Sequence, residues 1–209
     1  MSFIVAIDGP AAAGKGTVAK AVAERFGFAH LDTGLLYRVV GRVALEKIGP
    51  ALDEAEVISL ATQVDVVDLA RGDLRTAAVA QAASKVAVIP EVRETLVVFQ
   101  RNFAERSGGA VLDGRDIGTV ICPNADVKLF VTASAEIRAE RRFKELAAQG
   151  EETDFETVLE DVKARDARDS ERDVAPLAAA ADAVILDTSE LSIEAAIAAA
   201  IEAVDRVRA

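Results

Sequence analysis

The feature that most constrains this chain is a stretch near its N-terminus in which an apolar strand, a glycine-rich loop and a helix follow one another. Residues 3–8 read Phe-Ile-Val-Ala-Ile-Asp and are nearly all apolar, as a buried parallel strand requires. Residues 9–17 read Gly-Pro-Ala-Ala-Ala-Gly-Lys-Gly-Thr, and residues 18–26 place their apolar side chains on one helical face. This order of strand, loop and helix predicts a phosphate-binding loop.

The residue types in the loop suit an anionic ligand. Glycine at positions 9 and 14 allows backbone conformations in which successive N–H groups point at phosphate oxygens. The N-terminus of the helix contributes the positive end of its dipole, and Lys15 contributes a mobile positive charge. The loop residues expected to bind the nucleotide are Gly9, Pro10, Ala11, Ala12, Ala13, Gly14, Lys15, Gly16 and Thr17.

The residue after the loop lysine indicates how Mg²⁺ is held. The general phosphate-loop pattern has Ser or Thr directly after the lysine as a ligand for Mg²⁺, whereas this chain has Gly16 and only then Thr17. We therefore expect no metal site made by protein side chains. Phosphate oxygens and water should hold the ion, which suits Mg²⁺ because it keeps several waters.

Composition excludes several classes of protein. The chain of 209 residues is long enough for one large domain, and it has no apolar run of the roughly 20 residues that span a bilayer. We expect a soluble cytoplasmic protein. The single cysteine, Cys122, excludes an internal disulfide, and the single histidine, His30, excludes a histidine cluster. Neither residue is a candidate for the chemistry.

The charge of the chain argues against a nucleic-acid partner. The formal net charge is −11, whereas proteins that bind nucleic acid usually carry a basic surface. An anionic ligand must therefore be held by arginines that cluster locally, which is compatible with an acidic protein because salt screens charges beyond about 8 Å.

The pattern along the chain predicts a parallel α/β fold. Five apolar strands are expected at residues 3–8, 29–32, 110–113, 127–132 and 183–187, and helices alternate with them. This alternation predicts a five-stranded parallel sheet flanked by helices, of the P-loop NTPase-like kind. Two helix-rich inserts, at about 35–107 and 149–175, are expected to be a substrate-binding arm and a lid within one domain.

Some local signals add detail to this pattern. Residues 64–69 look like a further short strand, and the pair Gly49-Pro50 predicts the end of a helix. Asp53, Ser134 and Ser192 are expected to cap helices, and Thr153-x-x-Glu156 reads as a capping box.

Arginines near the expected strand ends and in the inserts are candidates for binding a second phosphate. Arg38, Arg93 and Arg115 could hold an acceptor phosphate, because guanidinium binds phosphate in a bidentate manner, although Arg93 could equally be a solvated helix arginine. The charged run 163–172 is by default a solvated helix face, and alternatively a lid that presents Arg165 and Arg172 to phosphates.

Four ordered motifs resemble those of the bacterial cytidylate kinases. They are residues 9–17, 31–38, 112–119 and 165–169, the last followed by Ala-Pro-Leu at 175–177, and together they span almost the whole chain. The resemblance implies the nucleoside monophosphate kinase fold. It also implies transfer of the γ-phosphoryl group of ATP, with Mg²⁺, to CMP or dCMP to give CDP or dCDP in pyrimidine metabolism.

The resemblance also implies roles for individual residues. Lys15, Arg115 and Arg165 would be catalytic, with Lys15 on the donor phosphates. The residues implied to bind the acceptor nucleotide are Thr33, Tyr37, Arg38, Ser84, Arg93, Arg115, Asp116, Arg165, Asp169 and Arg172. Family members often carry a three-stranded antiparallel sheet in the first insert, and here only residues 64–76 occupy that place, so the insert looks shortened.

Two other functions use the same phosphate loop. One is a kinase for another nucleotide or a small metabolite, and the other is a nucleotide-dependent switch or an ATP-dependent binding protein. A switch needs no second phosphate site, so the acceptor arginines favour a kinase. We expect a monomer, because closure of the inserts over substrates needs free arms.

Overall fold

The computed structural model describes residues 2–49 and 51–208, so Pro50 lies outside the described residues. The chain divides into two compact units, which are described separately. The sheet unit comprises residues 1–31 and 101–209, and the helical unit comprises residues 32–100.

The sheet has five strands in the order β2-β3-β1-β4-β5. They are β1 (Ile4–Asp8), β2 (Ala29–Asp32), β3 (Ala110–Gly114), β4 (Val127–Thr132) and β5 (Val184–Asp187). The pairs β1–β3, β1–β4 and β4–β5 are parallel, with Asp8 opposite Gly114 and Phe130 in the two neighbours of β1. The five-stranded parallel sheet predicted from the sequence is confirmed, and the strand that leads into the glycine-rich loop lies at its centre.

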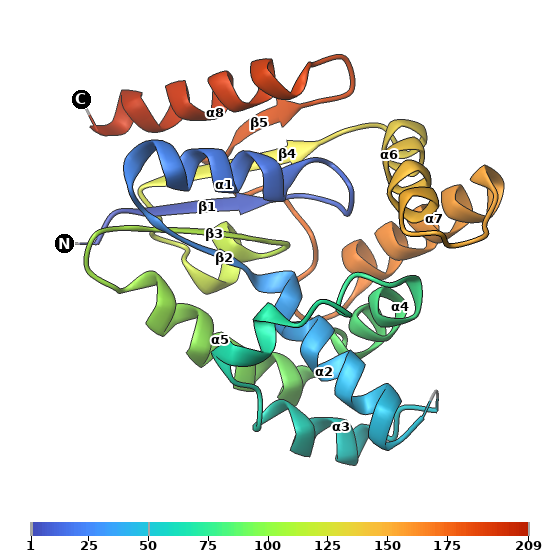
Figure 1. Ribbon diagram of the computed structural model, residues 1–209. Coiled ribbons are helices and arrows are strands. Elements are labelled where there is room, and N and C mark those ends of the chain that lie inside the picture. The colour runs from blue at the N-terminus through green and yellow to red at the C-terminus, as the bar shows by residue number, and fades with distance from the viewer. Residues whose placement is uncertain (1, 50, 209) are drawn as a thin grey trace. The chain divides into compact units, whose positions relative to one another are not determined.

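Helices cover the sheet and extend beyond the ends of its strands. The helices are α1 (Lys15–Phe26), α6 (Ala135–Ala148), α7 (Phe155–Glu171), α8 (Ile193–Arg208) and a short π-helix, η2 (Ile117–Ile121). Helices α1 and α8 lie side by side over one face of the sheet, and α6 and α7 pack together near the carboxyl ends of the strands (Figure 1). The core between the sheet and α1 and α8 is aliphatic, and it includes Val5, Ile7, Val18, Val22, Val111, Leu129, Val131, Ala200 and Val204.

Side-chain caps fix where the helices of the sheet unit begin. The hydroxyl of Ser134 accepts a hydrogen bond from Ile137 N at 3.3 Å, as expected. The cap of α7 differs from the expected capping box, because it is Asp154 whose carboxylate accepts from Thr157 N at 2.8 Å. Asp154 has the extended conformation of a cap residue, so the helix starts one residue later than Thr153 would set it.

The helical unit has its own core. It contains α2 (Thr33–Lys47), α3 (Glu54–Ala61), a 3₁₀-helix η1 (Val66–Ala70), α4 (Ala77–Val86) and most of α5 (Pro90–Ala104). Helices α2 and α4 approach closely at Gly41, where a Cβ atom would lie 2.8 Å from Ala83 N. The side chains buried between the helices are Leu36, Val40, Ala44, Val57, Ala61, Val86, Val92 and Leu96.

The strand expected at residues 64–69 is not present, and this prediction was wrong. Residues 66–70 form η1 instead, because Asp65 and Asp68 close a reciprocal capping box. Asp65 accepts from Val67 N at 3.2 Å, and Asp68 accepts from Asp65 N at 3.1 Å. Local carboxylate bonds therefore satisfy the backbone groups that a strand would have paired with a neighbour.

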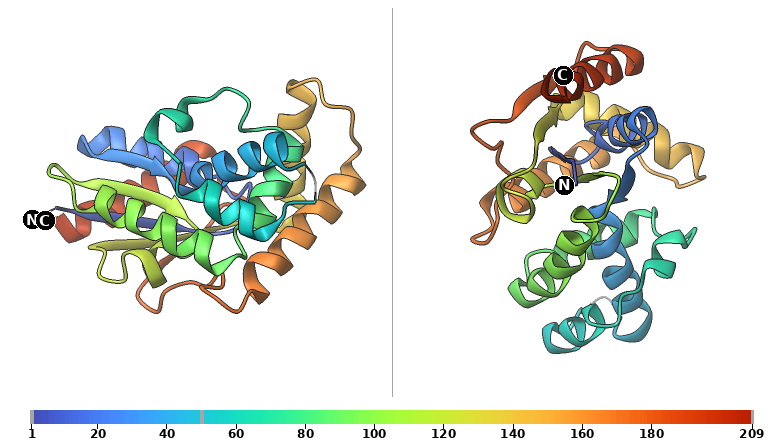
Figure 2. Two further views of the ribbon diagram at one scale, coloured as in Figure 1. Left: turned by 90° about the horizontal axis from the view of Figure 1, so that it is seen from below. Right: turned by 90° about the vertical axis from the view of Figure 1, so that its left-hand side faces the viewer.

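The C-terminal end of α8 and the start of β1 lie at the same end of the sheet unit (Figure 2). An arginine and three aromatic rings connect them. The guanidinium carbon of Arg208 lies 5.6, 5.2 and 5.3 Å from the ring centroids of Phe3, Phe26 and Phe28. We predict that Arg208→Ala lowers the free energy of unfolding by about 1 kcal/mol and the melting temperature by about 2–4 °C. Thermal denaturation followed by circular dichroism measures this shift.

A neighbouring arginine provides the control for this prediction. Arg206, on the same helix, pairs with the exposed Glu202, and such a pair contributes about 0.3–0.5 kcal/mol. Arg206→Ala should therefore lower the melting temperature less than Arg208→Ala. Equal shifts would show that the aromatic contacts of Arg208 add nothing.

Candidate active site

The glycine-rich loop has the backbone conformation that the sequence predicts. Gly9 has φ of +143°, and a Cβ atom at this position would lie 1.9 Å from Val131 O in β4. Gly14 has φ of +92° and precedes α1 directly, while Ala12, between them, has φ of 58°. Only glycine fits at position 9, because no side chain can be accommodated against the β4 backbone.

Lys15 lies within the loop that it is expected to serve. It is the first residue of α1, it is 7% exposed, and its Nζ donates a hydrogen bond to Pro10 O at 2.9 Å. Gly14 O accepts from Thr17 N and Val18 N, both at 3.1 Å, which begins the helix at the loop. The ammonium group is therefore held beside the backbone N–H groups of the loop.

Three residues that the sequence analysis did not select hold this loop in place. Arg138, on α6, donates to Ala11 O at 3.4 Å, and Thr188, after β5, donates its hydroxyl to Ala13 O at 3.0 Å. Arg141, also on α6, donates to Thr188 O at 2.8 Å. These contacts join residues 47 to 175 positions apart, so the sequence pattern alone could not identify them.

Arg138 also connects the loop to α7. Its guanidinium forms two hydrogen bonds to the carboxylate of Asp166, at 2.9 and 2.6 Å, and its side chain is only 5% exposed. This two-bond geometry fixes the orientation of both side chains. Helix α7, which carries Arg165 and Asp169, is thereby connected to the phosphate loop through a single arginine.

Two expected site residues, Arg115 and Asp169, form the centre of a charged cluster in the sheet unit. Arg115 Nε donates to Asp169 Oδ2 at 2.7 Å, and Arg165 Nε lies 3.9 Å from the same oxygen. Burial alone would raise the pKa of Asp169, but the charges of Arg115 and Arg165 outweigh it, so the pKa lies below its ordinary value. The carboxylate is therefore ionised at neutral pH and holds both guanidinium groups.

Arg172 and Asp116 form the second pair of this cluster. Arg172 Nη2 lies 3.6 Å from Asp116 Oδ1, and its Nε donates to Ala175 O at 2.5 Å. Both side chains are nearly buried, at 5% and 8% exposed. The structure thus brings together Arg115, Asp116, Arg165, Asp169 and Arg172, and it contradicts the reading of Arg165 and Arg172 as solvated helix residues.

The remaining expected residues lie in the helical unit. Thr33 begins α2 and is buried, and the ring of Tyr37, one turn later, has the guanidinium of Arg93 at 5.8 Å from its centroid. Arg38 donates to Leu74 O at 2.7 Å. Arg93 and Ser84 are each 3% exposed, so Arg93 is not a solvated helix arginine. Buried polar groups of this kind are typical of binding sites as well as of cores.

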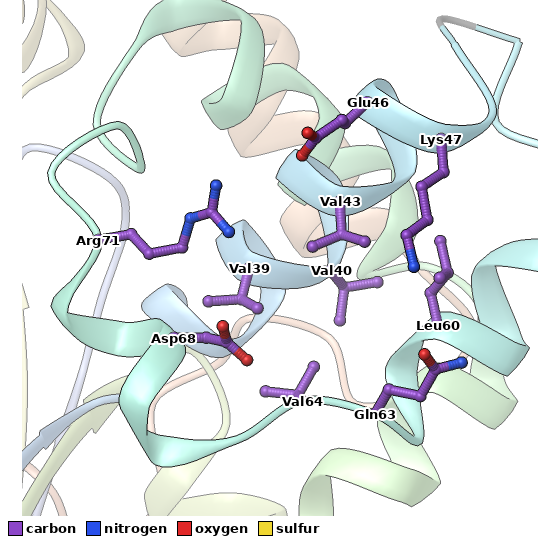
Figure 3. Close-up of a pocket in the computed structure, with 10 residues that line it drawn as sticks. All are labelled: Val39, Val40, Val43, Glu46, Lys47, Leu60, Gln63, Val64, Asp68 and Arg71. Atoms are coloured by element: carbon purple, nitrogen blue, oxygen red, sulfur yellow. The ribbon is translucent and has the colours of Figure 1, made fainter.

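A separate cavity of about 310 Å³ opens in the helical unit (Figure 3). Its lining residues are Val39, Val40, Val43, Glu46, Lys47, Leu60, Gln63, Val64, Asp68 and Arg71. None of the expected site residues is among them. Glu46 and Arg71 on its rim already pair with Arg42 and Asp73, so the cavity is not the candidate site.

The lone cysteine and histidine take no part in the charged cluster. Burial raises the pKa of Cys122 to about 11, so its reactive thiolate is scarce at neutral pH. His30, in β2, has Nε2 at 2.7 Å from Asp113 Oδ1. Within residues 2–49 and 51–208 no group of three or more His, Cys, Asp or Glu side chains could hold a metal ion.

Comparison with known sequences identifies the family. The family model described as Cytidylate kinase matches residues 5–206. The chain belongs to the cytidylate kinase family. The Cytidylate kinase of Cereibacter sphaeroides (strain ATCC 17023) is 60% identical over 205 residues, covering 98% of this chain and 96% of the relative. That of Azorhizobium caulinodans is 58% identical over 206 residues, covering 99% and 100%.

Solved structures show the same fold at low sequence identity. A protein from Eubacterium ventriosum is 17% identical with a TM-score of 0.59, and each chain is covered to 99%. Shikimate kinase from Bacteroides thetaiotaomicron is 12% identical with a TM-score of 0.52, covering 99% of this chain and 98% of its own. These two solved structures therefore share the fold of this chain.

Membership of the cytidylate kinase family makes this chain an enzyme. It is a nucleotide-binding transferase that uses ATP to phosphorylate a nucleoside monophosphate. None of the helices among the described residues is both long and apolar enough to span a membrane.

Proposed function

We propose that this chain transfers the γ-phosphoryl group of ATP, bound at the phosphate loop of the sheet unit, to CMP or dCMP. The observation that carries this proposal is the cluster of three guanidinium groups on two carboxylates, in the same unit as a complete phosphate loop. A nucleotide switch needs no such second set of cations. The products are ADP and CDP or dCDP.

On the donor side, the loop N–H groups and Lys15 bind the ATP phosphates. The left-handed backbone at Gly14 and the start of α1 suit this task, because they turn N–H groups toward an anion. Lys15 donates to Pro10 O in this structure, so its ammonium group already lies at the loop. It neutralises charge on the phosphates as the phosphoryl group leaves.

On the acceptor side, Arg38 and Arg93 bind the monophosphate, and Ser84 and Thr33 recognise the nucleotide by hydrogen bonds. Cytosine carries an exocyclic amine beside acceptor atoms, so hydroxyl and guanidinium groups can discriminate it from other bases. The burial of Ser84 and Arg93 supports this role, because a wrong base would leave their polar groups without water or a partner.

In the charged cluster, Asp116 and Asp169 hold Arg115, Arg165 and Arg172 in position. A phosphate oxygen carries more negative charge than a carboxylate oxygen. The guanidinium groups that Asp116 and Asp169 hold in position can therefore bind the transferring phosphoryl group. Asp169 is proposed to face the ribose, as in the resembling family. No general base is assigned, because the acceptor phosphate is already ionised near neutral pH.

The residues of this site are compatible with Mg²⁺ that is bound by the phosphates of ATP. Gly16 follows Lys15 where the general pattern has a hydroxyl ligand, so the phosphates and water would hold the ion. When bound, it neutralises charge on the phosphate oxygens. We further propose that the protein is cytoplasmic and monomeric. Its localisation and its oligomeric state both remain predictions from the sequence.

An ADP-release assay with ATP and Mg²⁺ tests the proposal, with CMP, dCMP, UMP, AMP and GMP offered in turn. We expect CMP and dCMP to give kcat/KM values at least tenfold above the others, because their amine satisfies the buried hydrogen-bonding groups. Turnover led by another acceptor would overturn the cytosine assignment. Saturable binding of CMP beside a nonhydrolysable ATP analogue would exclude a switch.

A further inference from the structure

The carboxylate of Asp8 is buried at the end of the central strand, where the glycine-rich loop begins. Its two oxygens accept hydrogen bonds from Ile117 N and Gly118 N, both at 2.7 Å, and the residue is 4% exposed. Asp8 directly precedes Gly9, whereas its partners open η2, 109 and 110 positions later. The sequence analysis assigned no role to this residue.

Asp8 fixes both ends of the segment that carries Arg115 and Asp116. Its backbone lies opposite Gly114 in the β1–β3 ladder, and its side chain binds the N–H groups of residues 117 and 118. Only residues 115 and 116 lie between these two attachments. One residue therefore sets the position of that segment relative to the phosphate loop.

The contact also determines what Asp116 can do. An acidic residue that precedes a helix usually caps it with its own side chain, but Asp116 makes no such bond to η2. Asp8 binds those N–H groups instead, and Asp116 places Oδ1 3.6 Å from Arg172. Gly118 eases this approach, since a Cβ atom there would lie 3.3 Å from Asp8 Oδ2, closer than most such contacts.

We propose that Asp8 is a positioning residue for phosphoryl transfer, which keeps Arg115 and Asp116 in fixed register with the phosphate loop. This inference rests on the roles proposed above for Arg115 and Asp116. Asp8 does not touch the substrate in this scheme and acts through the backbone of residues 117 and 118. A displacement of about 1 Å in a catalytic group can lower turnover about 100-fold, so such a fixed register has a large effect on rate.

The raised pKa of Asp8 shows that its ionised carboxylate destabilises the fold, which agrees with a functional rather than a stabilising role. Burial raises its pKa from 3.8 to about 6, and Asp116 adds to the rise, while the N–H groups of Gly118 and Ile117 and the charge of Lys15 oppose it. Lys128, bound to Asp182, and Cys122 are further ionisable groups near this contact. Because the folded pKa lies above the unfolded one, ionising Asp8 destabilises the fold as pH rises from about 4 to 6.

The test replaces Asp8 by asparagine, which offers one acceptor oxygen where the carboxylate offers two. We expect kcat with ATP and CMP to fall about 10- to 100-fold in D8N, with smaller changes in KM. The melting temperature at pH 7 should fall only modestly, because removal of a buried charge partly offsets the loss of one of the two buried hydrogen bonds. The matched control is D126N, because Asp126 Oδ2 accepts from Ile4 N at 2.7 Å at the other end of β1; its kcat should stay within twofold of wild type.

A second measurement uses the protein without bound nucleotides. Ionisation of substrate phosphates then cannot be confused with ionisation of Asp8. In amide NMR spectra of the wild type, the Ile117 and Gly118 signals should shift together with an apparent pKa near 6, and in D8N they should not titrate. A D8N kcat within twofold of wild type, or amide signals indifferent to the substitution, overturns the proposal. If the wild type phosphorylates no monophosphate, the proposed function fails, while the amide signals still show whether Asp8 holds residues 117 and 118.

If D8N does not fold, a variant at Gly118, one of the two residues whose N–H groups Asp8 binds, tests the proposal instead. Gly118→Ala brings a Cβ atom close to Asp8 Oδ2 and to Lys128 Cδ, at 3.3 and 3.1 Å, so the contact must shift by a few tenths of an ångström. We expect a severalfold loss of kcat in a folded protein. An unchanged kcat in this variant would overturn the proposal by itself.

Discussion

Replacing Lys15 with alanine should lower kcat by about 1,000-fold while the protein stays folded. Loss of one preorganised group that stabilises developing charge typically costs 10²–10³-fold in kcat, and Lys15 supplies a full positive charge to the donor phosphates. The structure explains why folding should survive. The ammonium donates a hydrogen bond to a loop carbonyl, Pro10 O, rather than filling the apolar core, and alanine favours the helix that begins at this position.

The matched control for this prediction is Lys20→Ala. Lys20 lies on the same helix, α1, and is exposed, so its removal changes the charge of the protein equally without touching the loop. ADP release with ATP and CMP measures kcat for both variants, and circular dichroism confirms that both are folded. If Lys15→Ala retained more than a tenth of wild-type turnover, the donor role of Lys15 would be wrong.

The central part of the fold could be predicted because its signals are local. Phe3–Asp8 and the glycines that follow combine an apolar strand, a turn that needs special backbone angles, and a helix start within a short stretch. Gly9 shows the physical origin of that signal, since Val131 O would lie inside any side chain at this position. Such constraints act on one residue and are visible in the sequence.

The predictions that failed concern places where two local preferences compete. Residues 64–69 contain the β-branched pair Val66-Val67, which favours a strand, but the flanking Asp65 and Asp68 cap each other's backbone and form a 3₁₀-helix. With no neighbouring strand to pair with, the carboxylate bonds prevail. Thr153 and Asp154 are likewise both suitable cap residues, and in the structure the cap of α7 is Asp154 rather than Thr153.

The candidate site was predicted as a set of residues but not as a set of contacts. The motifs contain Arg115 and Asp169, Arg172 follows shortly after the last of them, and the chemistry of these residues indicates phosphate binding. Which carboxylate holds which guanidinium depends on helix α7 meeting the end of β3, a tertiary contact that no periodicity encodes. Asp8 is the clearest case, because its partners lie 109 and 110 positions away and its own position looks like the last residue of a buried strand.

The second large effect is expected from Arg115→Ala, which should lower kcat/KM for CMP about 100- to 1,000-fold. Arg115 is proposed to neutralise charge on the phosphates, and guanidinium groups in that position contribute about 10³–10⁵ to turnover in related chemistry. The substitution also removes the hydrogen bond at 2.7 Å that Asp169 accepts. The pKa of Asp169 should rise, because its burial is then opposed only by Arg165 and Arg172.

A double variant separates the lost charge from the disturbed carboxylate. Breaking a largely buried ion pair leaves Asp169 partly uncompensated, so Arg115→Ala should lower the free energy of unfolding by about 1–3 kcal/mol. Adding Asp169→Asn removes that uncompensated charge and should restore much of the melting temperature. Turnover should not recover, because asparagine supplies no cation. If the double variant regained both stability and kcat/KM, then Arg115 would serve only to satisfy Asp169, and its proposed catalytic role would be wrong.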